Sequence, residues 1–355
     1  MLDDRGAAVD RTSSQAEAAD VSPLAAAERL VGSGHGLAAI EHLTEANRAS
    51  RDPAIEERLV TLRHEVFATL SRQASHGAHI PVVREAPVAG LEPTAPSDLT
   101  VATLRRGLAQ HGCVLVRGLV PAERAEALAR GIDRALDAFD ACSDQTGPGA
   151  AAPWYVPFTP RAGEYRVGGR RNWVRASGAL WTVDSPRMLF ELLEVVDETG
   201  IGSLVEAYLG ERPGLSANKC TLRRVPVDTN TNWHQDGAFL GRDVRTLNLW
   251  LALSACGTDA PGLEIVPRRF DDVLATGTDG ALFDWSVSPA LVEQVAGGPD
   301  VALRPEFSPG DALLFDHLFL HRTGVAPGMT HERWAIETWF FAPSTYPDGQ
   351  IPITY

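Results

Sequence analysis

The stretch that decides the fold is Trp233-His234-Gln235-Asp236-Gly237. His234 and Asp236 are separated by one residue, and side chains at positions i and i+2 of a β-strand leave the same face. An imidazole nitrogen and a carboxylate oxygen can therefore meet at one point in space. They are two of the three donors in the two-histidine, one-carboxylate arrangement that holds non-haem Fe(II) with open coordination positions. The motif predicts a second histidine ligand on a distant strand.

Two later histidines, His317 and His321, are candidates for that ligand. They are four residues apart and would share a face of one strand, so periodicity alone does not separate them. The residues that follow favour His321, because Thr323 comes next on the same face and a strand that opens with Arg333 comes one hairpin later. We expect His317 and His331 either to support the metal ligands from outside or to be structural.

Arg333 suggests a second bound molecule. A planar guanidinium binds a carboxylate through two hydrogen bonds, in a geometry that lysine cannot match. A carboxylate near an Fe(II) site suggests 2-oxoglutarate. Its 2-oxo acid end would chelate the metal, while its far carboxylate would meet Arg333 and the hydroxyl of Thr323.

From about residue 99 to residue 341, the chain resembles the phytanoyl-CoA dioxygenase family of Fe(II)/2-oxoglutarate-dependent oxygenases. The matching motifs are Gly112-Cys113-Val114-Leu115-Val116-Arg117-Gly118, residues 233–237, residues 247–253, and Gly310-Asp311 leading to His321-Arg322-Thr323-Gly324, with Arg333 twelve residues after His321. The resemblance implies a mixed α+β protein with a mainly β core, a double-stranded β-helix (jelly roll) flanked by helices. It assigns roles to His234, Asp236 and His321 as iron ligands, and to Arg333 and Thr323 as 2-oxoglutarate ligands.

Trp250 matches a tryptophan that lines the co-substrate site in this family. The β-strand pleat agrees with that role, because Thr246, Asn248 and Trp250 share one face while leucines occupy the other. We expect the polar and aromatic face to line the pocket and the leucine face to receive helices. On the preceding strand, Lys219 and Arg223 share one face and Arg224 belongs to the other, and either face is able to present a cation.

The rest of the chain divides by its periodicity. Helical spacing predicts a helical segment at residues 22–74, and a connector follows at 75–98. Period-two patterns at residues 218–225, 233–237, 246–253, 263–266, 312–315 and 333–341 predict strands. The predicted organisation is a disordered tail (1–21), the helical segment, the connector, a jelly-roll domain (99–346) and a C-terminal tail (347–355). The helical segment is either an arm for a partner or a second copy, or a layer packed on the main domain.

An irregular insert at residues 141–180 has the length of a lid. It is rich in aromatic residues and arginines, the arginines being Arg161, Arg166, Arg170, Arg171 and Arg175. One hypothesis is that these arginines meet an anionic group of the substrate. The other is that they are solvated or paired with the protein's own carboxylates.

Composition excludes several classes of protein. A formal charge of −14 argues against a nucleic-acid or anionic membrane partner. We find neither a secretory signal nor a membrane span, and the scattered cysteines Cys113, Cys142, Cys220 and Cys256 are typical of a reduced cytoplasmic protein.

The implied reaction uses O2 and 2-oxoglutarate to hydroxylate an unactivated C–H bond of a small molecule, with release of succinate and CO2. Desaturation, cyclisation or epimerisation would use the same residues. Asp236 argues against halogenation, which needs an open position for chloride in place of the metal carboxylate. The alternative from another class is a non-catalytic metal-binding scaffold with the N-terminal helices as its interaction arm.

Overall fold

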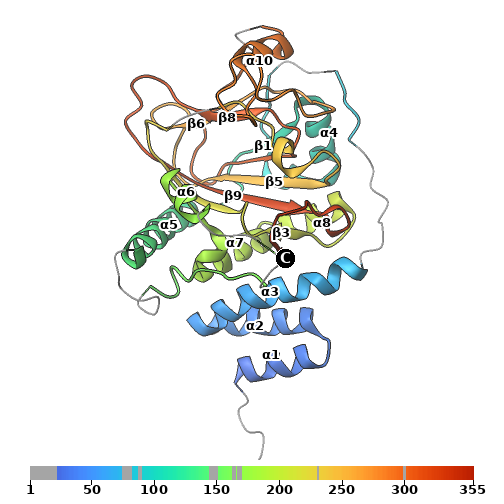
Figure 1. Ribbon diagram of the computed structural model, residues 1–355, viewed down its shortest axis with the longest axis vertical. Helices are drawn as coiled ribbons and strands as arrows, with labels where there is room; N and C mark the ends of the chain where they lie inside the picture. Colours follow the sequence, from blue (N-terminus) through green and yellow to red (C-terminus); the bar gives the residue numbers. More distant parts are fainter. Residues whose placement is uncertain are drawn as a thin grey trace, which may run out of the picture.

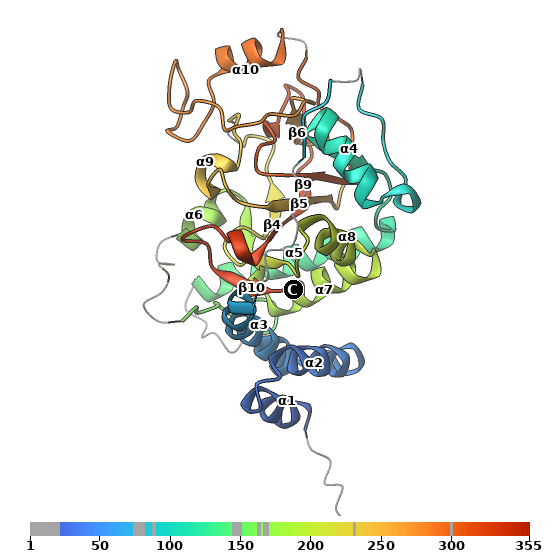
Figure 2. The same ribbon diagram turned by 90° about the vertical axis from the view of Figure 1, so that its right-hand side faces the viewer.

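The computed structural model describes residues 22–73, 82–86, 90–143, 151–161, 165, 170–229, 232–298 and 301–355. Three helices are stacked at one end of the molecule, a large sheet with flanking helices lies in the middle, and α10 (Pro289–Ala296) lies at the opposite end (Figures 1 and 2). The predicted order, helices first and a strand-rich part after them, is confirmed. The tail expected at residues 1–21 lies outside the described residues, as does part of the connector. None of the described helices is long and apolar enough to cross a membrane.

An eight-stranded antiparallel sheet, counted over the described residues, forms the centre of the fold. Its strands are β1 (Cys113–Val116), β2 (Ala179–Trp181), β3 (Gly214–Ser216), β4 (Thr221–Val225), β5 (Thr246–Ala252), β7 (Ala312–Phe315), β9 (Arg333–Phe341) and β10 (Pro352–Thr354). β9 pairs with β5 along one edge and with β4 and then β3 along the other. A second, two-stranded sheet consists of β6 (Gly262–Ile265) and β8 (His321–Gly324).

The two faces of the large sheet differ in chemistry. Leu247, Leu249 and Leu251 of β5 belong to the larger core, to which four helices contribute most of the helical side chains. These helices are α4 (Val101–His111), α5 (Ala122–Ser143), α7 (Pro186–Glu198) and α8 (Ile201–Leu209). The opposite face carries Trp250, which packs with Leu263 of the two-stranded sheet in a separate, aromatic core. The predicted division of β5 into a leucine face and a polar-aromatic face is confirmed.

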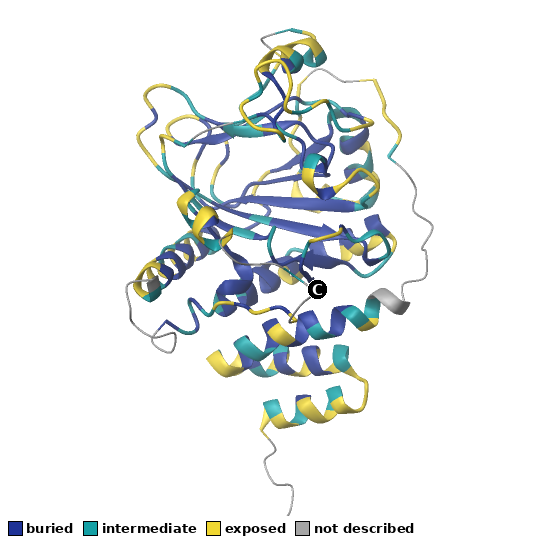
Figure 3. Ribbon diagram, in the orientation of Figure 1, coloured by how far each residue is buried: buried dark blue, intermediate teal, exposed yellow. Residues whose placement is uncertain are grey.

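The N-terminal helices form a layer against the main domain. They are α1 (Pro23–Gly32), α2 (Gly36–Ser50) and α3 (Pro53–Gln73). Ser22 caps α1 as its sequence predicts, accepting a hydrogen bond from the backbone N–H of Ala25 at 3.3 Å. α1 is largely exposed, whereas α2 and α3 are buried along one side (Figure 3). The layer therefore attaches through α2 and α3.

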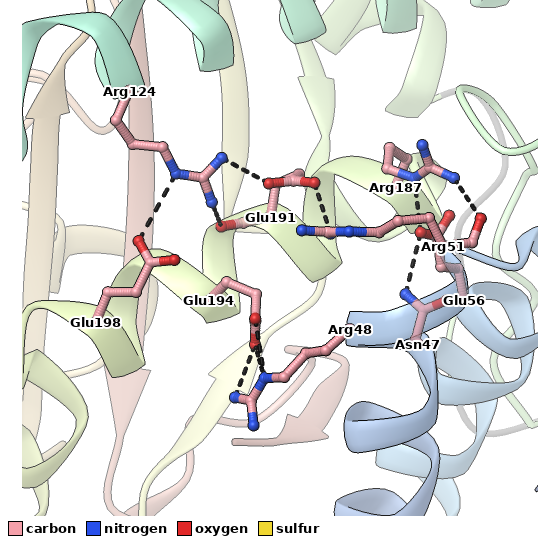
Figure 4. Close-up of polar contacts among 9 residues, drawn as sticks. All are labelled: Asn47, Arg48, Arg51, Glu56, Arg124, Arg187, Glu191, Glu194 and Glu198. Atoms are coloured by element: carbon pink, nitrogen blue, oxygen red, sulfur yellow. Dashed lines mark hydrogen bonds and ion pairs between the residues drawn. The ribbon is translucent and has the colours of Figure 1, made fainter.

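Ion pairs, one of them buried, join this layer to α7 (Figure 4). Glu56 accepts hydrogen bonds from Arg187 of α7 at 2.6 Å and from Asn47 of α2 at 3.1 Å. Its side chain has no solvent exposure. Further ion pairs in the same interface are Arg48–Glu194 at 2.9 Å and Arg51–Glu191 at 2.6 Å.

The C-terminal residues are not the tail that we expected at 347–355. They contain β10, which pairs with β3 and is buried. α3 packs over this strand, and Arg63 donates a hydrogen bond to the carbonyl oxygen of Thr354 at 3.1 Å. The strand is stabilised by an edge of the sheet and by a helix from the other end of the chain, and neither partner is visible in its local sequence.

The motif region also differs from a regular strand. His234 forms an isolated β-bridge with His321, and α9 (Gly237–Leu240) begins directly after Asp236. β7 ends at Phe315 and β8 begins at His321, so His317 does not share a strand with His321, contrary to our expectation. The turn between β7 and β8 connects the large sheet to the small one.

Replacement of Glu56 by alanine should lower the free energy of unfolding by about 3–5 kcal/mol, because it leaves the guanidinium of Arg187 without its carboxylate. Urea denaturation measures this change. The matched control is Glu41→Ala on the exposed side of α2, which should cost less than about 0.5 kcal/mol. Equal effects of the two variants would contradict the role given to Glu56.

Candidate metal and co-substrate site

His234, Asp236 and His321 come together at the junction of the two sheets. Reciprocal backbone hydrogen bonds of 3.0 Å join His234 to His321, which places their rings side by side with centroids 4.4 Å apart. Asp236 Oδ2 lies 3.7 Å from Nε2 of His321. One possible ligand atom from each of the three side chains lies within 4.8 Å of the others. The group therefore has the donors and the spacing to hold a metal ion.

The backbone orients both imidazoles in the same way. Nδ1 of His234 lies 2.9 Å from the carbonyl oxygen of Asn232, and Nδ1 of His321 lies 3.0 Å from that of Phe319. Because a carbonyl oxygen only accepts, each Nδ1 carries the proton and each Nε2 keeps a free lone pair. Such an outer partner is what fixes the tautomer of a metal-ligating histidine.

The surroundings keep His234 neutral. Burial, together with the neighbouring His321, lowers the pKa of His234 to about 4. Asp236 and His321 are 6% and 8% exposed. A neutral imidazole is the form that binds a metal ion, so the site needs no proton release from His234 at neutral pH.

The two residues beside the ligands in the motif are structural supports that the sequence did not assign. Gln235 is fully buried, donates to the carbonyl oxygen of Leu318 at 2.6 Å and accepts from the backbone N–H of Leu274 at 2.7 Å. Trp233 packs into a small core of its own, and the guanidinium of Arg322 lies 4.7 Å from the centre of its ring. Together they hold the motif between the 272–274 loop and the segment that leads into β8.

The other histidines of the β half lie outside this group. The carbonyl oxygen of His317 accepts from the backbone N–H of Gly237 at 2.8 Å, and its ring lies against the carbonyl oxygen of Arg242. His331 is exposed and contacts Thr330.

Arg333 is a completely buried cation. Its Nη1 donates to the carbonyl oxygen of Gly262 at 2.8 Å, and its guanidinium lies 5.4 Å from the centre of the Trp250 ring. Among the described residues it has no carboxylate within 4.0 Å. Burial and the nearby Arg223 lower the pKa of Arg333 to about 10, so it remains charged at neutral pH.

Two buried donors beside one another have no partner in the described part of the chain. They are Nε of Arg333 and Nε1 of Trp250. Thr323 lies two residues after His321 on the same face of β8, and it faces Leu263 of the aromatic core across the strand pair. Unpaired buried donors are costly, so these residues are arranged for a ligand that accepts hydrogen bonds. A carboxylate fits this set.

Register assigns the basic residues that the sequence left open. β4 pairs with β9 so that Arg223 faces Ala335, on the same face of the sheet as Trp250. Arg223 forms an ion pair with Glu337 at 2.8 Å. Arg224 points to the other face and pairs with Glu332. Lys219 lies 4.0 Å from Oδ1 of Asp236.

Most of the described arginines of the 141–180 insert serve the protein's own structure. Arg171 binds the buried Asp184 at 2.7 Å, Arg175 binds Asp140, and Arg161 donates to the backbone of α3. Arg170 is exposed at the start of α6 (Arg170–Ala176), and Arg166 lies outside the described residues. Arg171 and Arg175 therefore pair with the protein's own carboxylates, as the second hypothesis holds, whereas Arg161 binds a backbone carbonyl oxygen.

Two aromatic residues near the metal-binding group were missed by sequence reasoning. The ring of Trp285 lies 5.6 Å from that of His234, and the ring of Phe239 lies 6.2 Å from it. Phe239 is only three residues after Asp236, so its position near the metal-binding group could have been predicted from the motif. Trp285 comes from an irregular segment whose position no local pattern predicts.

No protein-family model matches the chain, and no curated protein matches it in sequence. Among solved structures it is similar to EctD from S. alaskensis with 2-oxoglutarate and 5-hydroxyectoine (16% identity, TM-score 0.49, 77% of this chain and 86% of the other). It is also similar to AviO1 from Streptomyces viridochromogenes Tue57 (17%, 0.45, 74% and 100%) and to the non-heme alpha ketoglutarate dependent carbocyclase SnoK (15%, 0.45, 70% and 87%). With TM-scores below 0.5, these matches leave the function to be inferred from this chain's own side chains.

Gln235→Ala should loosen the metal-binding group without removing a ligand, because it leaves the carbonyl oxygen of Leu318 and the N–H of Leu274 without partners. We expect a loss of about 10-fold or more in Fe(II) affinity, the usual effect of deleting an outer support. Competition with a chelator measures the affinity. Gln294→Ala on exposed α10 is the control and should leave it unchanged; the same affinity in both variants would show that Gln235 does not support the ligands.

Proposed function

We propose that the protein is an Fe(II)/2-oxoglutarate-dependent oxygenase of the phytanoyl-CoA dioxygenase type, acting on a small molecule. The observation that carries the proposal is a set of side chains that gather where the two sheets meet. The set combines two histidines with free Nε2 atoms, a carboxylate beside them, and a buried arginine that has no carboxylate within 4.0 Å among the described residues. His234, Asp236 and His321 would hold Fe(II), and Arg333, Thr323 and Trp250 would bind 2-oxoglutarate.

The arrangement of strands supports a jelly roll. The order β7-β5-β9-β4 forms one wall, and β6, β8 and the bridge at His234 lie against it. The ligands come from the smaller wall, whereas Arg333 and Trp250 come from the larger one. A co-substrate with a chelating end and a distant carboxylate would join the two walls.

When bound, Fe(II) with 2-oxoglutarate and O2 supplies the power to oxidise a C–H bond, with release of succinate and CO2. The residues of this chain would position the reactants and exclude water. Arg333 would hold the far carboxylate by charge-assisted hydrogen bonds inside a wall of Trp250, Trp339 and Phe315. Holding both molecules in place converts the encounter into an intramolecular reaction.

Hydroxylation is the simplest outcome, and desaturation, cyclisation or epimerisation would use the same residues. The presence of Asp236 favours these oxygen reactions over halogenation. A non-catalytic scaffold would have no use for a buried cation such as Arg333, which is costly without a ligand. The enzyme is therefore the better proposal.

Formation of succinate from 2-oxoglutarate, with Fe(II), O2 and ascorbate present, tests the class. We expect turnover by the wild type and a loss of at least about 100-fold in His234→Ala, because a metal site with two ligands binds iron poorly. His331→Ala, which replaces an exposed histidine, should behave as the wild type. Succinate formation that is equal in the two variants would refute the proposed function.

Arg333→Ala should raise the 2-oxoglutarate concentration needed for half-maximal rate. A buried charge-assisted pair is worth about 2–5 kcal/mol, which corresponds to roughly 30-fold or more in concentration. Arg224→Ala, on the other face of the sheet, is the matched control and should leave this concentration unchanged. An unchanged requirement in Arg333→Ala would remove Arg333 from the co-substrate site.

A further inference from the structure

The chain contains a single lysine, Lys219, beside 31 arginines. This lysine lies in the turn between β3 and β4, next to the metal-binding group. Arginines form the ion pairs of the scaffold, as in the α7 interface and in the 141–180 insert. Because Lys219 has a compact ammonium group and not a planar guanidinium, we expect its role to differ from that of the arginines in the scaffold.

The contacts of Lys219 leave its ammonium group available. Nζ lies 3.4 Å from the centre of the Phe239 ring and 4.0 Å from Oδ1 of Asp236. Among the described residues, Nζ of Lys219 makes no hydrogen bond within 3.5 Å. The other carboxylate oxygen of Asp236 faces His321. Lys219 is thus on the side of Asp236 away from that histidine, with three N–H donors to offer.

Aromatic side chains continue from Lys219 along the open side of the site. Phe239 lies edge to face with Trp285 at 6.5 Å, and Phe283 stacks on Trp285 at 5.1 Å with an angle of 7°. Phe239 is 36% exposed and Phe283 is 43% exposed, although both are large and apolar. Partly exposed aromatic rings beside a metal-binding group are typical of a ligand-binding wall.

The charges on this side of the sheet leave a positive excess. The basic groups here are Lys219, Arg223 and Arg333, and the carboxylates are Asp236 and Glu337, which gives a formal sum of +1 when all are charged. Burial lowers the pKa of Lys219, whereas Asp236 and Glu337 favour its charged form. Fe(II) and the 2-oxoglutarate dianion cancel one another, so the sum stays at +1 after loading. In a chain with a net charge of −14 this local excess favours an anionic ligand.

The same contacts disfavour a cationic ligand. The face of Phe239 that would attract a cation is already covered by Lys219, and a second positive group would meet the ammonium. A neutral ligand would cover the ammonium without offering it a charged partner.

We propose that Lys219 is the specificity-determining residue for a substrate carboxylate, and that Phe239 and Trp285 bind the flat, apolar body of the same molecule. This assignment rests on the proposed function, since it places the substrate beside the iron ligands. The substrate class is a small carboxylic acid with an aromatic or otherwise planar body. The carboxylate would lie at Nζ, and the body would lie along the wall next to His234.

Three probes of one shape and different charge test this assignment: naphthylacetate, naphthylacetamide and naphthylethylamine. Their affinities are measured by calorimetry on the protein loaded anaerobically with Fe(II) and 2-oxoglutarate. We expect naphthylacetate to bind at least about tenfold more tightly than naphthylacetamide, which is the effect of one charge-assisted hydrogen bond. Naphthylethylamine should bind most weakly. In Lys219→Met the carboxylate and the amide should bind equally.

Arg224→Met on the opposite face of the sheet is the matched control and should keep the preference for the carboxylate. Equal binding of the three probes by the wild type, no binding of naphthylacetate, or a preference that survives in Lys219→Met would each overturn the proposal. Thermal melting confirms that the variants are folded.

A second readout uses the single lysine directly. An acetylating reagent that reacts with amines should modify Lys219, and mass spectrometry follows the reaction. We expect naphthylacetate to slow it and naphthylacetamide to have no effect. Complete protection by 2-oxoglutarate alone, with no further effect of naphthylacetate, would assign Lys219 to the co-substrate and overturn the proposal.

Binding of Fe(II) and 2-oxoglutarate is measured separately on the same samples. Its absence would refute the proposed function, and the probe titrations on metal-free protein would still decide the role of Lys219.

Discussion

The reciprocal backbone hydrogen bonds between His234 and His321 are the interaction on which the site depends. They join a segment that precedes a short helix to the first residue of β8, although the two are 87 positions apart in the chain. Because both imidazoles leave this bridge on the same side, each Nε2 is presented to the same space. The supports around the bridge, above all the buried amide of Gln235, restrict the motif to that geometry.

The large sheet is unusual in having one apolar face and one face with buried charges. The leucines of β5 and the helices that flank the sheet provide the apolar packing that stabilises the domain. The other face carries Arg333 and Trp250, which in the described part of the chain have no carboxylate and no hydrogen-bond acceptor, respectively. Such groups lower stability when no ligand is bound, so a fold retains them where binding requires them. The residues that stabilise the domain and the candidate ligand-binding residues therefore lie on opposite faces of one sheet.

Much of this organisation follows from local patterns. Ser22 before Pro23 marks the start of α1, and the alternation of residue types along β5 is sufficient to distinguish its two faces. The pattern also indicates which residue types can hold a metal ion. Hydrogen-bonded caps and side-chain alternation depend on neighbours within a few residues, so they can be predicted without knowledge of the fold.

The sequence by itself therefore determined the N-terminal helices, the strand-rich part, the two faces of β5 and the candidate ligands His234, Asp236 and His321. Only the tertiary structure decided that β10 is a strand, that Arg171 pairs with Asp184, and that Lys219 and Trp285 lie beside the same metal-binding group. The physical reason is the range of the interactions. Strand pairing, burial and ion pairing join residues that are distant in the chain, and their partners are chosen by packing.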